Sequence, residues 1–62
     1  MTKGFWKHER FMDVYVWVLK VRYSGATYLK VLVEWWVRGK NLGLRKETIK
    51  IMREDLKFWR RV

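Results

Sequence analysis

Apolar and polar residues alternate through two long stretches of the chain. In residues 11–23 valine alternates with aromatic residues, and β-branched and aromatic side chains favour a pleated strand. In residues 27–38 the alternation is cleaner, and a period of two over a dozen residues predicts an antiparallel strand. Residues 24–26 separate the two stretches, and Gly25 is expected to supply a positive φ in that turn. The pattern therefore predicts a long β-hairpin.

The two faces of the second predicted strand differ in character. The apolar face, expected in the core, holds Thr27, Leu29, Val31, Val33, Trp35 and Val37. The mixed face holds Tyr28, Lys30, Leu32, Glu34, Trp36 and Arg38. The first strand is apolar on both sides, with Met12, Val14, Val16 and Val18 on one and Tyr15, Trp17, Leu19 and Val21 on the other. Such a strand bends through a core or has its second face covered by another element or subunit.

The C-terminal third of the chain leaves two interpretations open. Residues 39–46 form a basic loop in which two glycines and Asn41 are turn formers. Residues 48–52 alternate and are rich in β-branched side chains, which predicts a short strand followed by one helical turn from Arg53. Ile49, Met52 and Leu56 also lie at helical spacing, so a single helix over residues 45–60 is the alternative.

These elements predict an all-β fold, built on the hairpin of residues 11–38 and closed by residues 48–52 and a C-terminal turn. About sixty residues with three or four strongly bent antiparallel strands and a short C-terminal helical turn resemble an SH3-like small β-barrel. That class includes Tudor, KOW and Sm-type modules. The alternative fold is a β-hairpin followed by one C-terminal α-helix.

The run DVYVWVLKV…YLKVLVEWWVRG…TIKIMREDLKFW is also similar to short uncharacterised proteins of marine bacteriophages. The shared features are an early Trp-Lys-His, a long hairpin, a Trp-Trp pair and a closing Asp-Leu-x-x-Trp. This resemblance covers most of the chain and implies no catalytic residue and no established activity.

Length and composition exclude several classes of protein. A domain of 62 residues has a marginal core, and five tryptophans supply large apolar side chains where cysteine is absent. No cysteine and one histidine, His8, leave neither a disulfide scaffold nor a zinc ligand set. The uncharged run at residues 14–19 is too short to span a membrane, and the first ten residues show no secretory signal. We expect a cytoplasmic protein of a bacterial or phage-infected cell, with no cofactor, no membrane association and no small-molecule substrate.

Positive charge is concentrated in the C-terminal part. The net charge is +9, and residues 38–62 hold nine basic against three acidic residues, a balance that suits a polyanion. Aromatic rings interleaved with cations are typical of surfaces that bind single-stranded nucleic acid, DNA or RNA, with rings stacking on bases and cations contacting phosphates. The expected nucleic-acid-binding residues are Tyr28, Lys30, Trp36, Arg38, Lys40, Arg45, Lys46, Lys50 and Arg53.

Each candidate residue also has a structural interpretation. Trp36 and Tyr28 can close a small barrel, or Trp36 can pack against a second copy of the chain, which favours a homo-oligomer. Glu34 is expected to pair across the hairpin with Lys20 or Arg22 rather than act as an acid or base. His8 is expected to tether the N-terminus to the sheet edge. The sequence therefore indicates a non-enzymatic nucleic-acid-binding module with little sequence specificity; the alternative is a protein-interaction or assembly module, phage-derived, acting through an aromatic sheet face.

Overall fold

The computed structural model describes residues 1–37, 40–41 and 46–62, with the backbone alone at 37, 40 and 41. Its described part is built from antiparallel strands and one short 3₁₀ helix, which confirms the all-β prediction and the C-terminal helical turn. In chain order the elements are β1 (Gly4–His8), β2 (Val14–Ser24), β3 (Tyr28–Val37), β4 (Lys40–Asn41), β5 (Glu47–Met52), η1 (Arg53–Phe58) and β6 (Trp59–Arg61).

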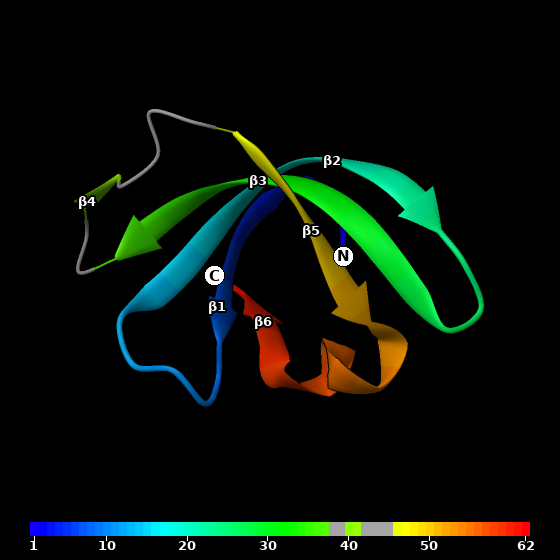
Figure 1. Ribbon diagram of the computed structural model, residues 1–62. Coiled ribbons are helices and arrows are strands. Elements are labelled where there is room, and N and C mark those ends of the chain that lie inside the picture. The colour runs from blue at the N-terminus through cyan, green and yellow to red at the C-terminus, as the bar shows by residue number, and fades with distance from the viewer. Residues whose placement is uncertain (38–39, 42–45) are drawn as a thin grey trace.

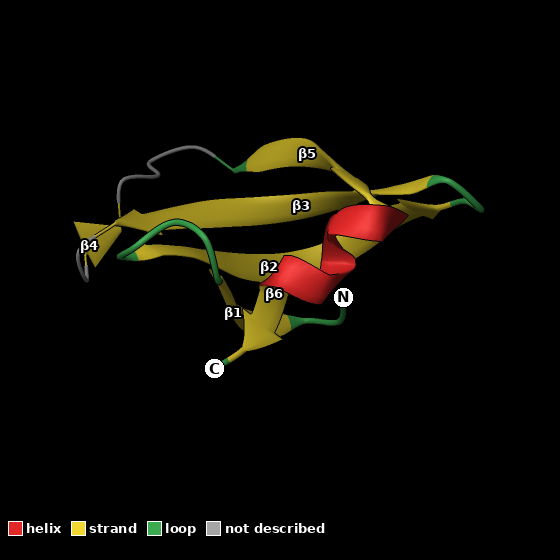
Figure 2. Ribbon diagram, turned by 90° about the horizontal axis from the view of Figure 1, so that it is seen from below, coloured by secondary structure: helices red, strands yellow, loops and turns green. Residues whose placement is uncertain are grey.

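The strands form one bent antiparallel sheet. Its order is β4-β3-β2-β1-β6, and β5 pairs with β3 on the edge that also carries β4. Long strands β2 and β3 arch over η1 and β6, and the last strand returns to lie beside the first (Figure 1). In the view from below, η1 and β6 lie on one side of the β2–β3 layer (Figure 2). The sheet therefore has a covered inner face and an opposite outer face; its assignment to the SH3-like barrels stays a prediction.

The core lies between this arch and the elements beneath it. Its buried side chains all come from the predicted strands: Val16, Val18, Leu29, Val31, Val33 and Ile51. The register places Val18 opposite Val33 and Leu29 opposite Ile51, so valine, leucine and isoleucine from three strands meet on one face. Each fully buried side chain of this size contributes roughly 1.5–3 kcal/mol. The prediction that the apolar face of residues 27–38 forms the core is confirmed for these members.

The hairpin is shorter than predicted at its ends. β2 starts at Val14 and not at Phe11, because Asp13 adopts a left-handed φ of 61° that interrupts an extended strand. Met12 consequently lies in the turn, 84% exposed, and not on the core side of β2. β3 starts at Tyr28 and not at Thr27, while its predicted end at Arg38 lies outside the described residues.

Two irregularities in β2 change which side chains face the core. The register shifts between Val18 and Lys20 and again between Val21 and Tyr23, as β-bulges do. Lys20 then lies opposite Leu32 on the outer face, and Val21 lies opposite the buried Val31. The prediction that Val21 shares a face with Tyr15 is therefore wrong, because strict alternation does not survive a bulge.

The same register places Trp17, and neither Lys20 nor Arg22, opposite Glu34. Neither basic residue therefore lies directly opposite Glu34, and an ion pair of Glu34 with one of them stays a prediction.

The ambiguous C-terminal segment resolves into strand and turn. Residues Glu47–Met52 form β5, and η1 begins at Arg53, as predicted, so the alternative of one helix over residues 45–60 is wrong. The period of two places Ile49 and Ile51 on the inner face, opposite Val31 and Leu29. A helix there would remove the six paired positions along β3.

Strands β1 and β6 were not predicted from the sequence. Residues Gly4–His8 pair with β2, and β1 also pairs with the three-residue β6. Trp6 packs against the core and His8 is buried. These two side chains of β1 anchor the N-terminal segment to the inner face of the sheet. Gly4 is favoured here because its φ of 143° lies in a region that residues with a Cβ rarely adopt. The expectation that His8 ties the N-terminus to the sheet is confirmed, as part of a complete strand.

Candidate nucleic-acid interface

The outer face of the sheet combines aromatic and basic side chains from four strands. Residues opposite one another in an antiparallel register share a face, so this face follows from the pairing and from the position of the core. Its described members are Phe5, Lys7, Tyr15, Trp17, Lys20, Tyr23, Tyr28, Lys30, Leu32, Glu34, Trp36, Thr48, Lys50 and Met52. Aromatic rings gather at both ends of this face, and the lysines Lys20, Lys30 and Lys50 lie toward the β2–β3 turn.

Two tyrosines and two lysines lie together near the β2–β3 turn, and we call Tyr23, Tyr28, Lys30 and Lys50 the tyrosine–lysine patch. The two rings are 5.2 Å apart between centroids, tilted by 36°. The Lys50 ammonium lies 4.3 Å from the centre of the Tyr28 ring, within cation–π range. In the register Lys30 lies directly opposite both Tyr23 and Lys50, on the two neighbouring strands. The patch therefore brings two aromatic rings and two cations together from three strands.

The charges of this patch are unusual for a sheet. Lys30 and Lys50 occupy directly opposed positions, where like charges destabilise the pair of strands. Lys20 lies one row further along the same face, opposite Leu32. Three exposed lysines thus share this end of the outer face with the two rings, and an anion bound among their ammonium groups would offset their repulsion.

The Tyr23 ring lies against the β2–β3 turn. A Cβ at Gly25 would lie 2.6 Å from the Tyr23 hydroxyl, so the end of this ring lies beside the glycine. The predicted positive φ at Gly25 is not adopted; among the described residues only Gly4 and Asp13 have a positive φ. Tyr23 is 48% exposed, so its ring is accessible at this end of the outer face.

Arg53 bonds to the same turn through its guanidinium. Its Nε donates to the Gly25 carbonyl, and one terminal nitrogen donates to the Ser24 hydroxyl at 2.6 Å. Its backbone N–H also donates to the Thr27 carbonyl at 2.9 Å. The guanidinium thus links the start of η1 to the hairpin turn, and the predicted phosphate contact of Arg53 stays a prediction.

Trp36 lies at the opposite end of the outer face, within an aromatic group formed by Phe5, Tyr15, Trp17 and Trp36. The Phe5 ring stacks on Tyr15 at 5.4 Å and meets Trp36 edge-on at 5.7 Å. Trp36 is half-buried, and its indole Nε1 is buried with no hydrogen-bond partner among the described residues. Phe5 thus occupies part of the ring surface that was expected to stack on a base.

The structure brings together three of the nine predicted binding residues, namely Tyr28, Lys30 and Lys50. Lys46 is exposed just before β5, and Trp36 and Arg53 are placed as described above. Arg38 and Arg45 lie outside the described residues, as does the side chain of Lys40.

Two residues of this surface, Tyr23 and Lys20, were missed by the sequence interpretation. Tyr23 ends an apolar run next to a turn, and hairpin pairing from that turn would have placed it beside Tyr28. Lys20 could not be placed on the outer face, because no sequence signal marks the bulge before it.

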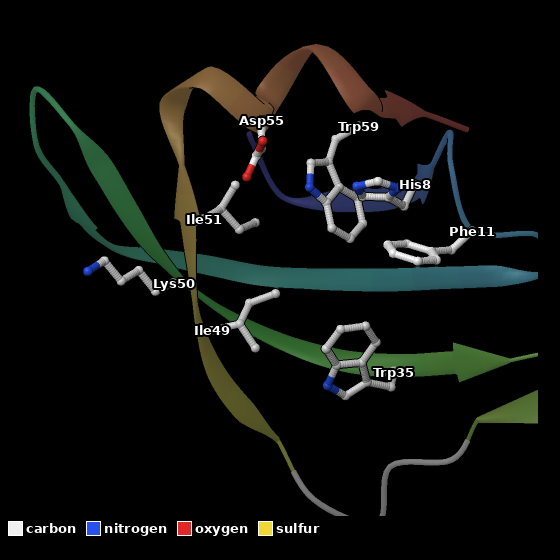
Figure 3. A pocket seen from close by; sticks show the side chains of 8 residues that line it. All are labelled: His8, Phe11, Trp35, Ile49, Lys50, Ile51, Asp55 and Trp59. Atoms are coloured by element: carbon white, nitrogen blue, oxygen red, sulfur yellow. The ribbon is translucent and has the colours of Figure 1, made fainter.

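A separate cavity of about 280 Å³ opens on the inner face, between β5, η1 and the β1–β2 turn. It is lined by His8, Phe11, Trp35, Ile49, Lys50, Ile51, Asp55 and Trp59 (Figure 3). Figure 3 shows the Lys50 amine directed away from the other lining side chains, so the walls are mainly aromatic and aliphatic. This cavity has no counterpart among the sequence predictions, because its lining residues come from six separate segments.

His8 has a defined orientation beside this cavity. Its ring contacts Phe11 at 4.7 Å and the edge of Trp59 at 4.8 Å between centroids. Its Nδ1 accepts a hydrogen bond from the backbone N–H of Arg10 at 3.1 Å, so the ring proton lies on Nε2. Across the described part of the chain, no group of three or more His, Asp or Glu residues is placed to hold a metal ion.

Comparison of this chain with known proteins adds no functional assignment to the geometry described above. Within the described residues no helix is long and apolar enough to cross a membrane. The resemblances to SH3-like barrels and to bacteriophage proteins stay predictions, as does the cytoplasmic location. No protein-family model, curated protein or solved structure matches this chain.

Proposed function

We propose that this protein is a non-enzymatic module that binds single-stranded nucleic acid with little sequence preference, through the tyrosine–lysine patch. The observation that supports this best is the direct opposition of Lys30 and Lys50 beside the contacting rings of Tyr23 and Tyr28. Two like charges at opposed sheet positions cost stability in the free protein, and a bound phosphate converts that cost into a favourable interaction.

The two tyrosines supply the second half of the interaction. Tyr23 has the more accessible ring, and a base stacking on an aromatic side chain contributes roughly 1–3 kcal/mol. Stacking is tolerant of base identity because every base has a π face, which accounts for weak sequence preference. Bases in a duplex are already stacked on one another, so this mode favours single strands.

The strength and salt dependence of binding test this proposal. We expect a fluorescently labelled oligo-dT strand to bind with a slope of log K against log salt of about −2, since three lysines at about −0.7 per phosphate face the patch. A duplex of the same length should bind more weakly at equal salt. Fluorescence anisotropy titrations at four salt concentrations give both results.

Two outcomes would contradict the proposal. Binding that does not change with salt would exclude phosphate contacts as its source. Tighter binding of the duplex than of the single strand would exclude base stacking on the tyrosines.

The aromatic group at the other end of the outer face supports a second candidate, an assembly module. Trp17 is 37% exposed, and the buried Nε1 of Trp36 lacks a partner within the described part of the chain. A second copy covering this group would bury apolar surface that a small domain otherwise leaves in water. If the oligonucleotide titration fails, sedimentation equilibrium of the protein alone distinguishes this function, since an assembly module shows concentration-dependent association.

A further inference from the structure

The inner-face cavity contains polar groups that the fold does not use. The Asp55 carboxylate, supplied by η1, has no hydrogen-bond or ionic partner within the described residues. Nor does the Nε2–H of His8, whose other ring nitrogen is already occupied. Both residues line this cavity, and Figure 3 shows them on opposite sides of the Trp59 indole. A carboxylate acceptor and an imidazole donor thus share an aromatic-walled cavity without partners.

We propose that this cavity binds a single nucleobase, with guanine the preferred one. Pockets for small ligands are mainly apolar, with a few placed polar groups that fix orientation, and this cavity has that composition. Its volume of about 280 Å³ accommodates a planar two-ring base. Trp59, Trp35 and Phe11 offer ring surfaces for stacking, and Phe11 is 59% exposed at the cavity mouth.

The polar groups select the base. Guanine presents two adjacent N–H donors on its Watson–Crick edge, which suit a carboxylate, and O6 and N7 acceptors, which suit an N–H donor. Asp55 supplies the carboxylate and His8 Nε2 supplies the donor. Uracil offers one ring N–H between two carbonyl oxygens, so it would leave the carboxylate with a single bond and bind more weakly.

This site is distinct from the tyrosine–lysine patch. The patch lies on the outer face and the cavity lies on the inner face; Lys50 contributes to both, but its amine points away from the cavity. The cavity would therefore bind a free nucleoside whether or not the outer face binds a strand. The base can come from a free nucleoside or from one position of a strand, and the two sources are separable by experiment.

Titration with guanosine and uridine, monitored by tryptophan fluorescence and by NMR shifts of η1, tests the proposal. We expect saturable binding of guanosine, and Asp55→Asn should weaken it roughly 5- to 150-fold, the range for losing a bidentate contact to a base. Glu54→Gln is the matched control, because it removes the same charge from an exposed neighbouring position of η1. Lys20→Gln/Lys30→Gln changes two lysines of the outer face that do not line the cavity, and it should leave guanosine binding unchanged, so failure of the outer-face proposal would not be mistaken for failure of this one.

Two further experiments distinguish a free nucleoside from a base within a strand, and a nucleobase from an alkylammonium cation. If the cavity also binds a base that belongs to a strand, an oligo-dT strand with one internal guanine should bind more tightly than oligo-dT. Asp55→Asn should then abolish this difference in affinity. Equal binding of the two strands would limit the site to free nucleosides. Three results would overturn the proposal: no saturable change with guanosine at millimolar concentration, equal loss in Glu54→Gln and Asp55→Asn, or binding of tetramethylammonium in place of guanosine. The last would identify a site for alkylammonium cations, which aromatic walls with a carboxylate also suit.

Discussion

Replacing Ile51 with alanine is expected to lower the free energy of unfolding by about 2–5 kcal/mol, the range for truncating a buried isoleucine. Ile51 is only 5% exposed and lies opposite Leu29, where β5 closes the inner face over β3. A domain of 62 residues has a total stability of roughly 3–9 kcal/mol, so this loss would remove much or all of it. Urea unfolding followed by tryptophan fluorescence measures the change.

Met12→Ala is the control for this prediction. Methionine is also a large apolar residue, but Met12 is 84% exposed in the β1–β2 turn, so its truncation should change stability by about 0.5 kcal/mol or less. Equal losses in the two variants would contradict the placement of the core.

The double variant Lys30→Gln/Lys50→Gln is expected to weaken single-strand binding strongly. Removing two phosphate contacts should reduce the magnitude of the salt slope by about 1.4. Since the two affinities converge near 1 M salt, this corresponds to roughly 50-fold weaker binding at 0.05 M salt. The same change removes the like-charge opposition between β3 and β5, so the stability of the free protein should not fall.

Lys3→Gln/Lys57→Gln is the matched control, since it lowers the net charge by the same amount. Lys3 precedes β1 and Lys57 lies in η1, so neither belongs to the outer face. We expect this variant to lose only a small, nonspecific part of the affinity. If both double variants weaken binding equally, net charge and not the tyrosine–lysine patch is responsible.

The sequence was sufficient to predict the strands in which the alternation of apolar and polar residues matches the alternation of buried and exposed side chains. Val31 and Val33 lie on the inner face of β3 because a period of two over ten residues leaves one consistent face. The strand β5 followed its β-branched residues Ile49 and Ile51. Local pattern and tertiary pairing give the same answer in these segments.

Other features depend on contacts that no local pattern shows. β6 has three residues and exists through its pairing with β1, some fifty residues earlier in the chain. The bulges of β2 moved Lys20 to the outer face and Val21 toward the core. The prediction for Arg53 rested on its charge alone. Its bond to the Ser24 hydroxyl could not be predicted, because that bond requires η1 to lie beside the hairpin turn.

The candidate site was predictable only in part. Alternation along residues 27–38 correctly placed Tyr28 and Lys30 on one face, away from the core. The opposition of Lys30 and Lys50 depends on the register between β3 and β5. No short turn joins these two strands directly, so their register cannot be predicted from the length of a turn. The cavity, with His8 and Asp55 from distant parts of the chain, is a product of the fold.

Photo-cross-linking tests the central claim most directly. An oligo-dT strand with one thymine replaced by 5-iodouracil, which links to nearby aromatic rings on irradiation, would be bound to the protein and the cross-linked residue identified by mass spectrometry. We expect the link at Tyr23 or Tyr28, whose rings lie beside the opposed lysines. Cross-links confined to other rings, such as Trp17 or Phe58, or none at a saturating concentration of strand, would contradict binding at the tyrosine–lysine patch.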